Sequence, residues 1–200
     1  MPGFSPTSVT LTHHTEGPVA AVRSIKTDIN TTSDGDLHLH YMLEGELDQL
    51  AIPARTHSAH ADNLWRHTCF EAFITGNISP VYFEFNFSPS TQWAAYGFTR
   101  YRKGMAPLRY GASTLIEMRY SNDRLELDAR IPHMVLKTLP GSGGLRLALA
   151  AVIEEKSGLL SYWALTHPPG SPDFHHSDSF ALHLQRPVPR APHAEAEFPP

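Results

Sequence analysis

Acidic, amide and cationic side chains recur at alternate positions along consecutive strand-like segments. Glu71 lies in the first segment, Glu84 and Asn86 in the second, and Arg102 just after the third. Because facing side chains on neighbouring antiparallel strands stand about 5 Å apart, these groups can converge on one sheet face. Together they could hydrogen-bond a polar ligand or transfer protons. The alternative is a solvated face with a structural ion pair.

Tryptophans accompany these polar groups. Trp65, Trp93 and Trp163 each fit a core position at least as well as an exposed one, yet a sheet face that meets only solvent has no need of them. An apolar platform beside a few fixed polar groups is the usual composition of a ligand pocket. The aromatic residues therefore favour the ligand site over the solvated face.

A proline-rich loop over residues 166–176 is the second candidate element. Prolines reduce the entropy lost when a loop is held in one conformation, so this loop suits the fixed presentation of His167, Asp173, His175 or His176. A structural loop that closes one end of the fold is the alternative.

Several kinds of chemistry find no support in the sequence. There is no GxSxG or HExxH motif, and the glycines at 141–144 lack the lysine and following helix of a phosphate-binding loop. The single cysteine, Cys69, sits in a strand pattern and fits a small core residue. His57, His60 and Asp62 are metal ligands by type, but no second motif completes a set. We predict no metal site.

The elements that must position these residues are strands. Residues 81–88 alternate apolar and polar side chains with a period of two, and turn-forming residues separate this run from its neighbours at 69–74 and 92–98. Further strand-like runs lie at 19–29, 37–43, 113–120, 124–131, 145–154, 159–165 and 180–184. Apart from a helical turn within 131–137, no helix is indicated. The pattern predicts an antiparallel β-sandwich of about ten strands.

Composition indicates one globular domain. The chain has 200 residues, a net charge of −4 and scattered basic residues, which argues against a nucleic-acid partner. It contains no apolar run of membrane-spanning length and no secretory signal pattern at its start, so we expect no membrane partner and a cytoplasmic location. We expect a flexible tail over 1–7, the domain over 8–185 and a proline-rich tail over 186–200. The sequence predicts no oligomeric state.

Four stretches together resemble a known family. They are LWRHTCFEAFI, YFEFNFSPSTQWAAY, YRKGM and SYWALTHPPGSPDFHHSDSF. Over about residues 8–185 the chain resembles the small bacterial DOMON-like proteins, which are similar to family-nine carbohydrate-binding modules. The resemblance implies an antiparallel β-sandwich, of immunoglobulin-like or jelly-roll type, that binds haem or a sugar in a pocket at one sheet.

For haem, the resemblance implies a methionine paired with a histidine or lysine as axial ligands. Met105 or Met118 would have to pair with His167, His175 or His176, and no spacing selects a pair. We therefore expect no cofactor, with haem b as the alternative.

The preferred hypothesis is a non-catalytic module that binds a small carbohydrate-like molecule in a concave site on one sheet. Trp93 and Trp163 would stack on the sugar, and His175 would close one edge. The full set of candidate ligand-binding residues is Trp65, Glu71, Glu84, Asn86, Trp93, Arg102, Trp163 and His175. A haem-binding electron-transfer module is one alternative. The other is an enzyme that uses Glu71 or His175 as general acid or base on a small molecule.

Overall fold

The chain folds almost entirely into β-strands. The computed structural model describes residues 6–17, 21–108 and 115–186. Within these residues the strands are β1 (Thr7–His13), β2 (Val22–Thr31), β3 (Leu37–Gly45), β4 (Cys69–Gly76), β5 (Tyr82–Phe87), β6 (Trp93–Phe98), β7 (Ala106–Pro107), β8 (Leu115–Tyr120), β9 (Arg124–Ile131), β10 (Leu145–Glu154), β11 (Leu160–Ala164) and β12 (Leu182–Leu184). The helical elements there are α1 (His133–Leu136) and the 3-10 turns η1 (Leu47–Gln49), η2 (Leu64–Arg66) and η3 (Ser177–Ser179).

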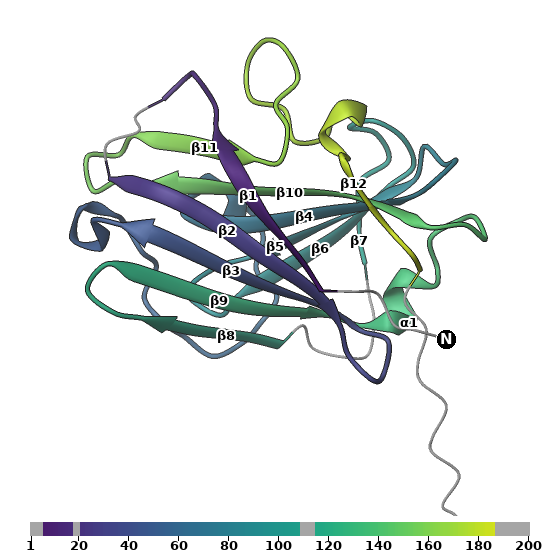
Figure 1. The fold of residues 1–200 in the computed structure, drawn as a ribbon, viewed down its shortest axis with the longest axis horizontal. Coiled ribbons are helices and arrows are strands. Elements are labelled where there is room, and N and C mark those ends of the chain that lie inside the picture. Colours follow the sequence, from purple (N-terminus) through teal and green to yellow (C-terminus); the bar gives the residue numbers. More distant parts are fainter. Residues whose placement is uncertain (1–5, 18–20, 109–114, 187–200) are drawn as a thin grey trace, which may run out of the picture.

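The strands form one antiparallel sheet that curls into a half-barrel (Figure 1). Its hydrogen-bonded order is β7-β6-β5-β4-β10-β11-β1-β2-β3-β9-β8, and β12 pairs with β10. Strand β1 joins two arms, because residues 7–11 pair with β2 whereas Thr12 and His13 pair with β11. We call β2, β3, β9 and β8 the front arm, and β7, β6, β5, β4, β10 and β11 the rear arm.

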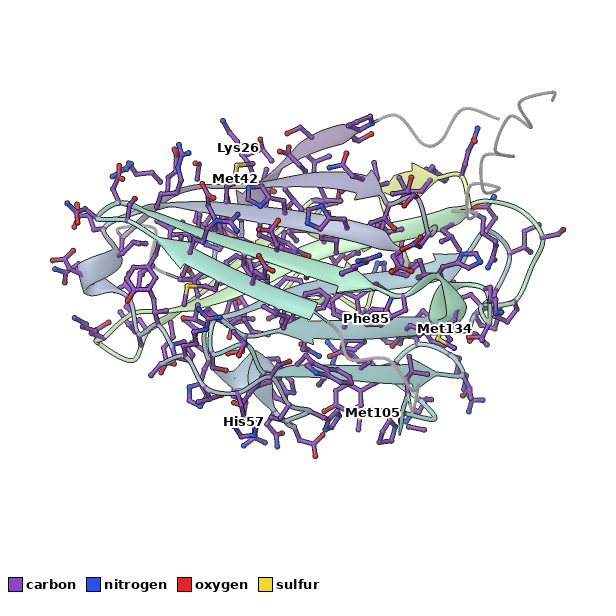
Figure 2. All side chains as sticks on the ribbon, turned by 90° about the horizontal axis from the view of Figure 1, so that it is seen from below. Lys26, Met42, His57, Phe85, Met105 and Met134 are labelled. Atoms are coloured by element: carbon purple, nitrogen blue, oxygen red, sulfur yellow. The ribbon has the colours of Figure 1, made fainter. Side chains whose placement is uncertain are left out.

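The main hydrophobic core lies between the two arms. The front arm contributes Leu39, Tyr41 and Leu127, and the rear arm contributes Phe85 and Leu149, all of them fully buried. Figure 2 shows Phe85 in the interior of the molecule. Removing a side chain of this size from water contributes roughly 1.5–3 kcal/mol. Packing between the arms therefore accounts for much of the stability of the curled sheet.

The two arms differ in what covers their outer faces. In β3 buried residues alternate with half-buried ones, as expected for a strand with one solvated face. In β4 and β5 every residue is buried. A second apolar cluster, which includes Phe73, Phe98 and Phe180, covers the outer face of the rear arm. Phe174, from the loop between β11 and β12, packs against it.

The all-β antiparallel prediction is confirmed, and the helical turn predicted within 131–137 is α1. The predicted β-sandwich and its count of about ten strands are not confirmed. The described residues contain twelve strands, and β1 pairs with both arms, so the strands form one continuous curled sheet and not the two separate sheets of a sandwich. Strand β1 is absent from the predicted strands, although the alternation of Val9 and Leu11 with polar residues indicates it. Residues 1–5 and 187–200, most of the two expected tails, lie outside the described part. No helix in the described ranges has the length and hydropathy needed to span a membrane.

Candidate functional site

A pocket of about 950 Å³ opens on the outer face of the rear arm. Glu71 on β4 and Glu84 on β5 lie at its floor, since both are almost fully buried. The remaining lining residues come from the loop before β4, from β6, β7, β10 and β11, and from the loops after β6 and β11. They are Asp62, Asn63, Trp65, Arg66, Tyr96, Phe98, Arg102, Met105, Pro107, Val152, Leu160, Tyr162, Pro172, Phe174 and His175.

Strand register brings the floor residues together. Glu71 pairs with Asn86 across β4 and β5, and Glu84 is two residues before Asn86, so Glu84 is the diagonal neighbour of Glu71. Diagonal neighbours on one face are separated by roughly 7 Å. Asn86 Nδ2 donates a hydrogen bond of 2.7 Å to Glu84 Oε1. Asn86 thus orients one carboxyl group from beneath.

The burial of these residues excludes the solvated-face alternative. Glu71 is 3 % exposed, Glu84 5 % and Asn86 0 %. Glu71 Oε1 is buried and receives no hydrogen bond from any described group. Its backbone is held from the core side, because Tyr41 of the front arm donates a hydrogen bond of 3.0 Å to the Glu71 carbonyl oxygen. A buried, unpaired carboxyl oxygen is costly, and such a group at a pocket floor marks a functional site.

Burial shifts the titration of both floor carboxyls. It raises the pKa of Glu71 well above its usual value, and the neighbouring charge of Glu84 adds to the increase. Burial also raises the pKa of Glu84, while the hydrogen bond from Asn86 opposes the increase. Two adjacent carboxylates in an apolar setting repel each other, so the pair holds a proton more tightly than exposed carboxyls do.

His175 forms a wall of the pocket. Its Nδ1 lies 2.8 Å from Tyr82 Oη, and its Nε2 lies 3.8 Å from Glu84 Oε2. The rings of Phe73 and Phe98 contact it edge-on, with centroids 5.0 and 5.2 Å away. Burial in this aromatic setting lowers the pKa of His175 to about 4, so the imidazole is neutral at pH 7.

Arg102 reaches the pocket from a tight turn after β6. Its φ of 51° lies in the left-handed region, which non-glycine residues seldom adopt. The Arg102 N–H donates to Tyr82 Oη at 3.1 Å, and its Nη2 donates to Asp173 Oδ1 at 2.8 Å. Tyr101 Oη donates to the other Asp173 oxygen at 2.6 Å. Asp173 therefore ties the loop after β6 to the loop after β11 at the pocket rim.

Burial acts to raise the pKa of Asp173, but the hydrogen bonds from Tyr101 and Arg102 outweigh it and lower that pKa. Asp173 is consequently a carboxylate at neutral pH, and its charge is matched by Arg102.

The opposite wall combines aromatic rings with polar groups. Tyr96 Oη donates a hydrogen bond of 2.6 Å to Asp62 Oδ1. Trp65 is 47 % exposed, and the Arg66 guanidinium lies 5.3 Å from the centre of its ring. A half-exposed indole at a pocket edge can pack against the apolar face of a bound molecule.

The structure brings five of the eight predicted residues to this pocket and places one more directly behind it. Glu71, Glu84, Arg102, His175 and Trp65 line it. Asn86 is fully buried and reaches the pocket only through Glu84.

Trp93 and Trp163 do not line the pocket, and we correct their expected stacking role. Trp163 is 5 % exposed in the core between the arms, where its Nε1 donates to Ser161 Oγ at 3.1 Å. Trp93 packs against the same core and contacts the ring of His60. Trp93 pairs with Phe87 and so shares its parity, which faces the core and not the pocket.

Sequence reasoning missed several pocket residues. Phe98 and Phe174 line the pocket, and Tyr82 hydrogen-bonds to His175 in its wall. The sequence indicated Asp62 only as a metal ligand by type and Asp173 only as a loop residue, whereas they anchor Tyr96 and Arg102. The parity shared by Glu84 and Tyr82 was a usable signal for Tyr82. No local signal identified Phe174, because its loop is distant in sequence from β4 and β5. Asp62 lies shortly before β4, but in a loop whose residues follow no regular pattern.

The described residues contain no group of three or more histidine, cysteine or acidic side chains placed to hold a metal ion. Of the methionines considered for haem, Met105 lines the pocket with His175, whereas Met118 lines a separate cavity beside Leu47 and Tyr120. His167 is bonded to the Thr12 carbonyl oxygen, and His176 lines a neighbouring pocket.

We expect the pocket histidine to make the protein acid-sensitive. The folded-state pKa of about 4 lies below the unfolded value of 6.5, so the unfolded state binds more protons as the pH falls through this window. The His175 contribution to stability is present above pH 6.5 and is lost toward pH 4. Between pH 6.5 and 5 the parent should lose about 2 kcal/mol relative to His175→Gln. Urea unfolding of both proteins across this range measures the difference.

Two other buried groups also change the stability of the protein with pH. Glu71 and Glu84, with raised pKa values, change stability in the opposite direction. Both are present in the two proteins, so the comparison retains only the part of the Glu84 contribution that depends on its contact with His175. His57→Gln, at an exposed histidine (Figure 2), is the matched control. Parallel stability curves for the parent and His175→Gln would contradict the expected shift.

Comparison with solved structures shows what the fold is similar to. The chain resembles a protein from Bacteroides uniformis ATCC 8492, described provisionally as carbohydrate-binding, with a TM-score of 0.59, 12% identity and coverage of 88% of this chain and 83% of that one. It also resembles a family-9 carbohydrate-binding module from Caldicellulosiruptor kristjanssonii in complex with glucose, with a TM-score of 0.45, 12% identity and coverage of 81% and 75%. No protein-family model and no curated protein matches the chain. At this identity the first similarity shows a shared fold.

Proposed function

We propose that the protein is a binding module for a small carbohydrate-like molecule, held in the pocket of the rear arm. One observation carries the proposal: a pocket of about 950 Å³ combines a floor of buried polar groups with walls of aromatic side chains, among which Trp65 is half exposed. Sugars present hydroxyl groups at their edges and C–H groups on their faces, and such a pocket complements both. The provisional description of the Bacteroides protein with the same fold as carbohydrate-binding agrees with it.

Each wall then has a role in holding the ligand. Glu71 and Glu84 would hydrogen-bond hydroxyl groups, and Arg102, fixed by Asp173, would donate from the rim. Trp65 and Phe174 would pack against the apolar face of the ring. We expect an affinity in the micromolar range, about −8 kcal/mol.

An enzyme is the second candidate, and one observation favours it. Both floor carboxyls have raised pKa values, as a general acid needs near neutral pH. In this reading Glu84 would exchange a proton with the ligand while Asn86 holds its other oxygen. Chemical conversion of a hexose or disaccharide by the protein would favour an enzyme over a non-catalytic binding module.

Haem fits the pocket residues less well. An axial histidine needs a ring nitrogen free to face the iron, but His175 Nδ1 is bonded to Tyr82 and its Nε2 faces Glu84. Two buried carboxyls at the floor also suit a polar ligand better than the apolar face of a porphyrin. We keep haem as a proposal to be tested by absorbance, where a Soret band at one haem per chain that is lost in Met105→Leu would establish it.

Isothermal titration with a panel of hexoses and their disaccharides tests the proposed function. At least one member should bind with a Kd in the micromolar range, and Glu84→Gln should weaken that binding at least tenfold. Glu117→Gln, on the edge strand β8 with its side chain 74% exposed, is the matched control and should bind as the parent does. The proposal is contradicted if no sugar binds, or if both variants bind the same sugar equally.

A further inference from the structure

The pocket has more acidic than basic side chains, and among the described residues no arginine or lysine is hydrogen-bonded to the floor carboxyls, although the charge of Arg102 acts on both and partly opposes the rise in their pKa values. Three acidic and two basic side chains line the pocket. Of the basic pair, Arg102 is bonded to Asp173 just outside the lining, and Arg66 lies over the ring of Trp65. His175 is the remaining nitrogen base, and it is held neutral among aromatic rings. None of these groups hydrogen-bonds to Glu71.

Within the described part of the chain, Glu71 lacks a hydrogen-bond donor to one of its carboxyl oxygens. It is 3 % exposed, lines the pocket, and has one carboxyl oxygen without a hydrogen-bond donor among the described residues. The side-chain amide of Asn86 already donates a hydrogen bond to Glu84. A ligand that brings its own donor to Glu71 would remove the cost of the buried oxygen, and a charged donor would offset the repulsion between the two carboxylates.

The walls favour an ammonium group as that donor. Trp65, Tyr96 and Phe98 line the pocket beside the carboxyls, and aromatic faces attract organic cations. A divalent metal ion needs more ligands than this floor provides, because no cluster of three or more ligating side chains is found in the described ranges. Two carboxylates among aromatic rings are sufficient for a protonated amine.

We propose that the pocket selects an amine-bearing sugar, whose ammonium group binds between Glu71 and Glu84 while its ring packs against the aromatic wall. The proposal rests on the proposed function and names its ligand class. Binding would draw both carboxyls into the charged form. The preference for the amine would therefore weaken as the pH falls and these carboxyls take up protons, which burial makes them do at a higher pH than exposed carboxyls.

Matched pairs of ligands provide the test. The full chain is titrated at pH 7 with D-glucosamine, D-galactosamine and D-mannosamine, and with the corresponding hexoses, D-glucose, D-galactose and D-mannose. An amine of this kind is largely protonated at pH 7. At least one hexosamine should bind tenfold or more tightly than its hexose, and N-acetylation of that hexosamine should remove the advantage. Glu71→Gln should also remove it, whereas Glu117→Gln should retain it.

The possible outcomes separate this inference from the proposed function. Equal affinities within every pair would overturn the amine preference and leave the sugar module standing. Binding of cyclohexylamine without binding of any hexose or hexosamine would keep the amine subsite and overturn the sugar module. The absence of binding by every one of these probes would overturn both.

Discussion

Replacing Glu71 by glutamine is expected to make the folded protein more stable at pH 8 while it removes tight binding in the pocket. The parent must bury a carboxyl group with an unbonded oxygen beside a second carboxyl, and glutamine keeps the shape without the charge. We expect a gain of about 1–2 kcal/mol in the free energy of unfolding, and a loss of affinity for the hexosamine of about 30-fold or more.

The pH dependence of this gain has a definite sign. The folded-state pKa of Glu71 is raised, so its stabilising contribution is complete below the unfolded value of about 4.5 and is lost as the pH rises. The advantage of Glu71→Gln should therefore be present at pH 8 and small at pH 4. Urea unfolding at the two pH values checks it, with Glu117→Gln expected to stay within about 0.5 kcal/mol of the parent. Destabilisation by Glu71→Gln at pH 8 would show that the carboxylate is satisfied in the fold.

Replacing Trp163 should affect mainly stability, whereas replacing Trp65 should affect mainly ligand binding. Trp163→Ala should cost about 3–5 kcal/mol of stability, because it removes a large side chain that is 5 % exposed between the arms. Trp65→Ala should cost much less, about 1 kcal/mol, because that side chain is half exposed and loses only about half of the burial free energy. Loss of the indole platform should instead reduce affinity for a bound sugar by about 3- to 10-fold. Chemical unfolding and titration of each variant measure the two effects.

A milder variant keeps this test decisive if Trp163→Ala does not fold. Trp163→Phe retains most of the apolar volume and loses only the hydrogen bond to Ser161 and part of the packing, about 1–2 kcal/mol. It should bind the sugar as the parent does. If Trp163→Phe loses affinity and Trp65→Ala does not, the pocket lies elsewhere.

Local patterns predicted the strands well because one face of each strand must be buried. The alternation in β3 and β9 was visible in the sequence and corresponds to burial of every second residue. The turn at Gly35, whose φ is 80°, separates β2 from β3 as its sequence indicates. The curling of the sheet through β1 was not predicted, because the pairing of one strand with two distant partners leaves no local pattern.

Side-chain alternation along the strands also predicted part of the site. Glu71, Glu84 and Asn86 share a parity on adjacent strands, so a register set by a hairpin is enough to bring them together. The roles of Trp93 and Trp163 were misassigned because a tryptophan suits either face, and only its parity relative to the core decides between them. Phe174 and Asp173 reach the pocket through a long loop whose path depends on contacts made across the whole fold.

The sequence by itself determined the strands, their alternation and the carboxyl–amide set on β4 and β5, since these follow from side-chain periodicity and short turns. Tertiary structure alone decided that this face is covered by loops and is a pocket. It also decided that Glu71 is left without a donor and that His175 is enclosed by aromatic rings. Burial depends on what packs over a residue. Here one covering segment, residues 172–180, is far in sequence from β4 and β5, whereas the other, residues 62–66, lies just before β4 in the chain.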